Sequence, residues 1–141
     1  MLPRFRHLLV PLDFTEKNAA ALEVAFDIAV HNRARTSLLH VVEPIPNADS
    51  ELNRFVEQLA LRAATDLESR AQRFTDSGLS VEPKVHVGKR LPEIVQFAAH
   101  HQVDLIVMSS HPLDPDQPAQ SWNTLSYQVS VLCRCPILLV K

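Results

Sequence analysis

The chain has 141 residues, a net charge of −2, 46% hydrophobic residues and 21% charged residues. These values predict one folded domain over residues 1–141 and exclude a fibrous or disordered chain. Glycine is scarce: a usage of about 7% would give on the order of ten residues, and the chain has only Gly78 and Gly88. A phosphate-binding loop made of several glycines is therefore disfavoured.

Charge and hydropathy also limit the partners and the location of the protein. Lys and Arg residues are dispersed along the chain, so we expect no nucleic-acid partner. The apolar run from Leu8 to Leu12 is interrupted by Pro11 and is too short for a signal-peptide core or a membrane span. We expect a soluble, cytoplasmic protein with no membrane partner.

Short apolar segments alternate with segments of helical periodicity, which is typical of β-α-β units. The first strand is predicted at residues 8–12. The helix that follows has apolar residues at helical spacing from Leu22 to Ala29, with Thr15 as its N-cap. The second strand is predicted at residues 37–42.

The middle of the chain predicts a long helix, an edge strand and a short helix. Residues 52–74 hold one apolar stripe, and Gly78 stands where a C′ glycine ends a helix. The next strand, over residues 81–87, contains Pro83, which favours the edge of a sheet. A short helix begins near Pro92, because proline is well tolerated in a first turn.

The last part of the chain completes the alternation. The continuous apolar run 105–108 predicts a central strand covered on both faces. After a proline-rich segment, a helix over residues 125–132 leads to a final strand, Ile137 to Val140. Five strands and four helices predict an open, doubly wound parallel sheet of order 3-2-1-4-5. Its ligand site would lie between the first and fourth strands, at Asp13 to Thr15 and Ser109 to Thr124.

Four segments of the chain resemble the signature segments of the universal stress protein family. They are Val10 to Thr15, Leu38 to Pro44, Asp104 to His111 and Cys135 to Val140. The resemblance covers essentially the whole chain. It implies the same Rossmann-like fold, of the adenine nucleotide alpha hydrolase-like type, a homodimer, and a role in surviving stress.

The members of that family that bind ATP resemble one another in a motif after the fourth strand: glycine, two residues, glycine, about nine residues, glycine, then Ser or Thr. The matching positions here are Ser109, Pro112 and Asn123 followed by Thr124. Glycine lets backbone N–H groups approach phosphates at positive φ, whereas Pro112 has no N–H group and a fixed φ. We therefore expect no tight ATP binding and assign no cofactor.

Two further residues match the nucleoside side of the family's site. The resemblance places Asp13 near an adenosine and the backbone of Val41 against an adenine. If a nucleotide binds, Asp13, Val41, Ser109 and Thr124 are the candidates to hold it. The alternative, favoured by the missing glycines, is that Asp13 makes local N–H bonds at a strand end and that Val41 belongs to the core.

Other groups carry weaker evidence for chemistry. His100 and His101 are adjacent and do not share a helix face, so they make a poor metal site. Cys133 and Cys135 form at most a metal or redox half-site, and packing explains them better. His111 lies at the predicted crevice and either contacts a ligand or begins an exposed loop. There is no G-x-S-x-G motif, and we expect no catalytic residue and no metal.

The final strand indicates how the chain associates. An apolar edge strand, Ile137 to Val140, is a template for pairing, and twofold pairing would satisfy it. The resemblance implies a homodimer through the same strand, and Leu138→Pro is expected to break it. The sequence thus predicts a non-catalytic, dimeric stress-response protein that acts through contacts with an unidentified protein. The alternative is an ATP- or AMP-binding signalling module with a rebuilt phosphate loop, at most a slow nucleotide hydrolase; segment 112–121 has no assigned role.

Overall fold

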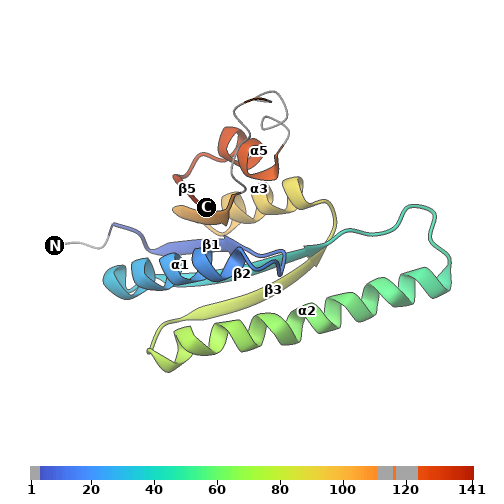
Figure 1. Cartoon of the computed structure of the whole chain (residues 1–141), viewed down its shortest axis with the longest axis horizontal. Helices are drawn as coiled ribbons and strands as arrows, with labels where there is room; N and C mark the ends of the chain where they lie inside the picture. The colour runs from blue at the N-terminus through green and yellow to red at the C-terminus, as the bar shows by residue number, and fades with distance from the viewer. Residues whose placement is uncertain (1–3, 111–115, 117–123) are drawn as a thin grey trace.

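The computed structural model of the chain describes residues 4–110, 116 and 124–141. Its five strands form one parallel sheet in the order β3-β2-β1-β4-β5, which confirms the predicted topology (Figure 1). The strands are β1 (His7–Pro11), β2 (Arg35–Val42), β3 (Val81–Val87), β4 (Leu105–Ser109) and β5 (Ile137–Val140). The described helices are α1 (Asn18–Asn32), α2 (Ser50–Asp76), α3 (Arg90–His100) and α5 (Leu125–Leu132).

Side chains alternate between two hydrophobic layers along each central strand. Leu8 of β1 packs with α1 and α2 on one face, and Leu9 packs with α3 and α5 on the other. The first four residues of β4 are all buried, as the continuous apolar run predicts. Figure 1 shows the sheet between these two pairs of helices.

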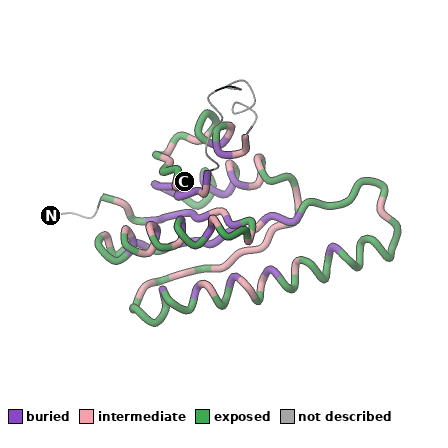
Figure 2. The backbone as a smooth tube through the Cα atoms, in the orientation of Figure 1, coloured by how far each residue is buried: buried purple, intermediate pink, exposed green. Residues whose placement is uncertain are grey.

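The long helix α2 is buried mainly along its second half, and Val56 is the buried residue of its first half. The Asp49 side chain caps its first turn by accepting a hydrogen bond from the N–H of Leu52 (2.9 Å). Gly78, at φ +77°, ends the helix in the left-handed conformation that favours glycine, as predicted. The apolar stripe is buried toward Phe74, but Phe55 is 50% exposed, and Figure 2 shows the first turns largely exposed. The predicted stripe is therefore a core surface over part of its length.

Two predicted boundaries differ from the structure. Thr15 is not the N-cap of α1: the helix begins at Asn18 after Lys17, without a side-chain cap at that position. The reason is that the Thr15 side chain turns back to bond Asp13 instead. The strand β2 also begins at Arg35, two residues before the predicted start, because its pairing with β1 begins at His7.

The two edges of the sheet have different characters. Pro83 lies in β3, which pairs only with β2 among the described strands, so its prediction as an edge strand is confirmed. Gly88, just after β3, leaves room for the Glu93 side chain, because a Cβ atom there would lie 2.6 Å from Glu93 Oε1. In the described part of the chain, no helix is both long and apolar enough to cross a bilayer.

His7, the first residue of β1, is buried and links the end of α3 to β2 through its ring. Its ring Nδ1 bonds the carbonyl of His101 (2.9 Å), and its Nε2 bonds the hydroxyl of Ser37 (2.7 Å). A carbonyl can only accept, so Nδ1 carries the proton and Nε2 accepts from Ser37 in the neutral ring. Burial lowers the pKa of His7 below its ordinary value of 6.5 and outweighs the hydrogen bond to His101, which raises it.

This lowered pKa makes the stability of the protein depend on pH. Below about pH 6.5 the unfolded chain binds a proton at His7 more readily than the folded chain. The contribution is therefore complete above that pH and is lost as pH falls through the folded-state pKa. Urea unfolding at pH 8 and pH 5 should show His7→Gln less stable than the wild type at pH 8, with a smaller difference at pH 5. His31→Gln, on the exposed end of α1, is the control, and a His7→Gln difference that does not change with pH would contradict the argument.

Candidate functional site

A cavity of about 240 Å³ opens at the carboxyl ends of β1, β2 and β4. Its floor is apolar and includes Leu39, Ile94 and Met108, while its rim is polar. The four residues predicted to hold a nucleotide all line it: Asp13, Val41, Ser109 and Thr124. The sheet thus has its cavity at the topological switch point, as the strand order predicts.

Asn18, the first residue of α1, organises the loop beside this cavity. Its side chain is 1% exposed, and its Oδ1 accepts from the N–H groups of Asp13 (3.0 Å) and Phe14 (2.7 Å). Its Nδ2 donates to the Ser109 hydroxyl (3.0 Å), which donates to the carbonyl of Lys17 (3.2 Å). One buried amide therefore ties the end of β1 to the end of β4.

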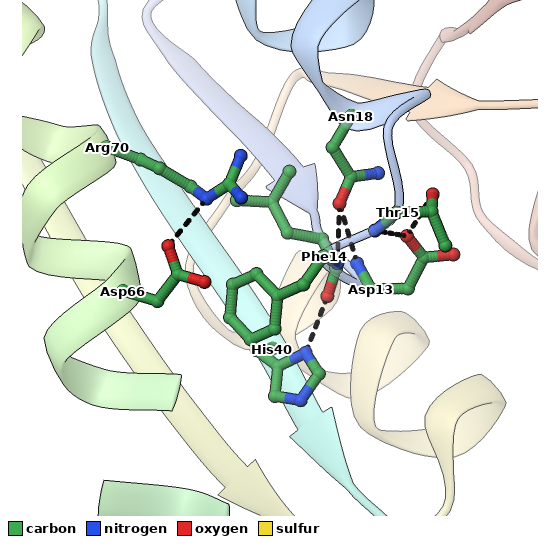
Figure 3. Close-up of polar contacts among 8 residues, drawn as sticks. Asp13, Phe14, Thr15, Asn18, His40, Asp66 and Arg70 are labelled. Carbon is green, nitrogen blue, oxygen red and sulfur yellow. Dashed lines mark hydrogen bonds and ion pairs between the residues drawn. The ribbon is translucent and has the colours of Figure 1, made fainter. Parts of the chain in front are cut away.

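Phe14 turns the chain at the tightest point of the loop. Its φ of +63° lies in the left-handed region, which is uncommon for a bulky residue. Its ring packs against the ring of His40 (centroids 4.3 Å apart), and the Arg70 guanidinium carbon lies 5.4 Å from its centre. Figure 3 shows the Phe14 ring directed toward α2 while Asn18 holds its backbone from the other side. These contacts offset the unfavourable backbone conformation.

The ring of His40 is fixed in turn by the end of β1. Its Nδ1 bonds the carbonyl of Leu12 at 2.7 Å, so this nitrogen carries the proton. A second hollow, of about 200 Å³, lies on this side of Phe14 and is lined also by Leu59, Arg62 and Asp66. Phe14 thus lines the hollow beside α2, while the preceding residue, Asp13, lines the cavity above β1 and β4.

The Asp13 carboxylate is bonded within its own loop. Its Oδ1 accepts from the N–H (3.0 Å) and the hydroxyl (2.7 Å) of Thr15. Partial burial of Asp13 opposes its charge, but hydrogen bonds from Thr15 and Asn18 outweigh it and lower the pKa of the carboxyl. The alternative predicted for Asp13, a strand-end acid with local N–H partners, describes this geometry.

The other predicted residues have defined structural roles. Val41 is buried in the α3 layer of the core and also borders the cavity. Thr124 is the N-cap of α5, and its hydroxyl accepts from the N–H of Tyr127 (3.3 Å). His111, Pro112 and Asn123 lie outside the described residues, as does segment 112–121 apart from residue 116.

Three residues at this cavity were not predicted from the sequence. The sequence gives no signal for Asn18, because a polar residue in a first helical turn is common and Ser109, its partner across the sheet, lies 91 positions away. Arg90 and Ser126 also line the cavity. Arg90 arrives at the start of α3, a helix that the sequence places from Pro92 onward, so its approach to the β2 end is a tertiary effect.

The fold and the cavity define an α/β protein with a small cavity at the switch point of its parallel sheet. A family model described as the universal stress protein family matches residues 4–141, and the chain belongs to this family. It is 26% identical over 148 residues to universal stress protein YxiE of Bacillus subtilis (strain 168), covering 97% of this chain and 99% of that protein.

Solved structures agree with the fold. Universal stress protein UspA from Lactobacillus plantarum has a TM-score of 0.81 at 22% identity, covering 98% of this chain and 99% of that chain. The universal stress protein from Archaeoglobus fulgidus in complex with dAMP has a TM-score of 0.68 at 16% identity, covering 97% of this chain and 98% of that one.

The central position of Asn18 can be tested by truncation. Asn18→Ala leaves the backbone N–H groups of Asp13 and Phe14 without their acceptor and removes the donor to the Ser109 hydroxyl, so the free energy of unfolding should fall by about 1–3 kcal/mol. Asn53→Ala, on the exposed face of α2, should stay within about 0.5 kcal/mol of the wild type. Equal effects in urea unfolding would show that the Asn18 contacts do not hold the loop.

Proposed function

We propose that this universal stress protein is a non-catalytic homodimer that acts through protein contacts and does not bind ATP tightly. The observation that carries this proposal is the bonding of Ser109. Its side chain occupies the space between β4 and the start of α1, bonded to Asn18 and Lys17. The ATP-binding relatives resemble one another in having glycine at the matching position.

The size and chemistry of the cavity support the same conclusion. Its 240 Å³ is below the roughly 300–1,000 Å³ of most ligand pockets. In the described part of the chain, no histidine or cysteine lines it. Its carboxylate, Asp13, has a lowered pKa and is thus a weak base at neutral pH, where a general base needs a pKa close to the working pH.

The proposed dimer joins through β5. This strand pairs with β4 alone among the described strands, so its other edge is open. Leu138 and Leu139 are 39% and 37% exposed although they point to opposite faces of the sheet. An apolar edge strand that is partly exposed on both faces suits pairing with a second copy.

A nucleoside monophosphate-binding signalling module is the second candidate. The observation that favours it is the gathering of Asp13, Val41, Ser109 and Thr124 around one cavity, with Arg90 as a cation on its rim. The A. fulgidus protein, solved with dAMP, supplies a precedent within the fold. Its 16% identity carries no residue of its site to this chain.

Mass spectrometry under native conditions separates the two candidates. The freshly purified protein should carry no nucleotide, and Mg-ATP should give no saturable rise in melting temperature. A saturable rise with AMP but not with ATP would favour the second candidate, and one with ATP would overturn the proposal.

Restoring the missing glycines tests whether their absence is what prevents ATP binding. Combining Ser109→Gly, Pro112→Gly and Asn123→Gly restores the family's motif, and we expect this variant to gain a saturable response to Mg-ATP. The matched control is Ser109→Ala with Pro112→Ala and Asn123→Ala, which removes the same side-chain groups without adding glycine and should not respond. No response in the glycine variant, if it is folded by circular dichroism, would show that the glycines are not what limits binding.

The register of β5 identifies the position that tests the dimer. The carbonyls of Pro136 and Val140 accept from β4, so the alternation places the Leu138 amide toward β4 and the Leu139 amide toward the open edge. Leu138→Pro therefore weakens the sheet as well as the dimer. Leu139→Pro removes a donor from the open edge and should give a folded monomer.

Light scattering after gel filtration measures this outcome. The wild type should have twice the mass of the 15.8 kDa chain. Leu139→Thr keeps the N–H group and should remain dimeric. A dimer of unchanged mass in Leu139→Pro, over a range of concentrations, would exclude pairing through this edge.

A further inference from the structure

The two cysteines lie in the short connection between α5 and β5. Cys133 caps the end of α5, and Cys135 precedes Pro136 and the start of β5. Both thiols are half-buried and pack against the hydrophobic layer of α3, which confirms the packing role predicted for them. Both also line one cavity of about 390 Å³, which borders the second half of α3, whereas the first cavity borders Arg90 and Ile94 in its first half.

The rest of this cavity has the character of a soft-ligand site. Its walls are mainly apolar and come from α3 and the end of α5, including Val95, Ala98 and Leu132. Among the described residues, no carboxylate or imidazole lines it, and the polar side chains besides the thiols are Gln102 and Arg134. Two sulfur ligands without oxygen ligands select soft cations and not Mg²⁺ or Ca²⁺.

The number of ligands narrows the choice of cation. Zinc takes four protein ligands at structural sites and three at catalytic sites, and the described residues contain no group of three His, Cys, Asp or Glu side chains suited to a metal. A monovalent d¹⁰ cation such as Cu(I) is satisfied by two thiolates in a linear arrangement. Cys133 and Cys135 supply that number from one short stretch of chain.

Burial and charge describe how the cation would be held. Both thiols are half-buried and pack against the hydrophobic layer of α3, which shields them from solvent. Binding exchanges the protons for the cation: Cu⁺ and two thiols give one S–Cu–S unit of charge −1 and two released protons. The Arg134 side chain, which borders the same cavity, offsets this negative charge.

We propose that Cys133 and Cys135 form a binding site for one Cu(I) ion per chain in the cavity between α3 and the α5–β5 corner. This site is separate from the switch-point cavity and from the proposed function. It requires no rearrangement of the sheet, because both ligands belong to a segment that already borders the cavity.

Competition with a chromogenic Cu(I) chelator, on the reduced full-length protein without oxygen, tests the site. The wild type should withdraw one equivalent of Cu(I) per chain, and X-ray absorption should show two sulfur neighbours. Cys133→Ser and Cys135→Ser should each lower the affinity at least 100-fold. Arg134→Gln should keep the stoichiometry and weaken binding, because it removes the compensating charge only.

The controls separate loss of the site from loss of the fold. Each variant should keep the circular dichroism spectrum and oligomeric mass of the wild type, since serine nearly matches cysteine in size. Met108→Leu removes a thioether that lies at the other cavity and should bind Cu(I) as the wild type does. Retained binding in the double serine variant, or one Cu(I) shared between two chains, would overturn the proposal.

Discussion

The side chain of Asn18 is the interaction on which the arrangement around the cavity depends. The end of a parallel strand leaves backbone N–H groups that have no partner in the sheet, and these groups need another acceptor. Here a single amide accepts from two of them and donates across to the end of β4. Its position in the first turn of α1 couples the direction of that helix to the spacing of β1 and β4.

The hydrogen bonds made by Asn18 have a consequence for the chemistry of the cavity. Because Ser109 is engaged by Asn18 and Lys17, and Asp13 is engaged by Thr15, most of the polar capacity near β1 is used within the protein. What remains around the cavity is apolar surface with a few groups at the rim.

The sequence predicts the architecture well because period and length determine it. Buried strands such as β4 are short apolar runs, and α2 shows its period over 27 residues and ends at a glycine with positive φ. Strand order follows from the handedness of the crossovers, and the position of Asp13, Val41, Ser109 and Thr124 around one cavity follows from that order. These features need only local pattern and topology.

What the sequence does not predict depends on contacts between distant positions. The left-handed conformation of Phe14 is sustained by His40 and Arg70, and no local signal distinguishes it from other phenylalanines. Thr15 looks like a helix cap, and it bonds to Asp13 because the bend brings them together. The apolar stripe of α2 indicates amphipathicity but not how far the sheet extends beneath it, so the exposure of Phe55 is a tertiary result.

The first half of α2 is more exposed than the second, which gives the molecule two levels of local stability. Helical segments of this length are marginal without tertiary packing, and here the first turns are stabilised mainly by the Asp49 cap and by their own backbone hydrogen bonds. Their amides can open to solvent while Leu67, Phe74 and the sheet remain closed. Fraying at this end therefore exposes the segment between β2 and α2 to proteases without unfolding the sheet or the cavity at its switch point.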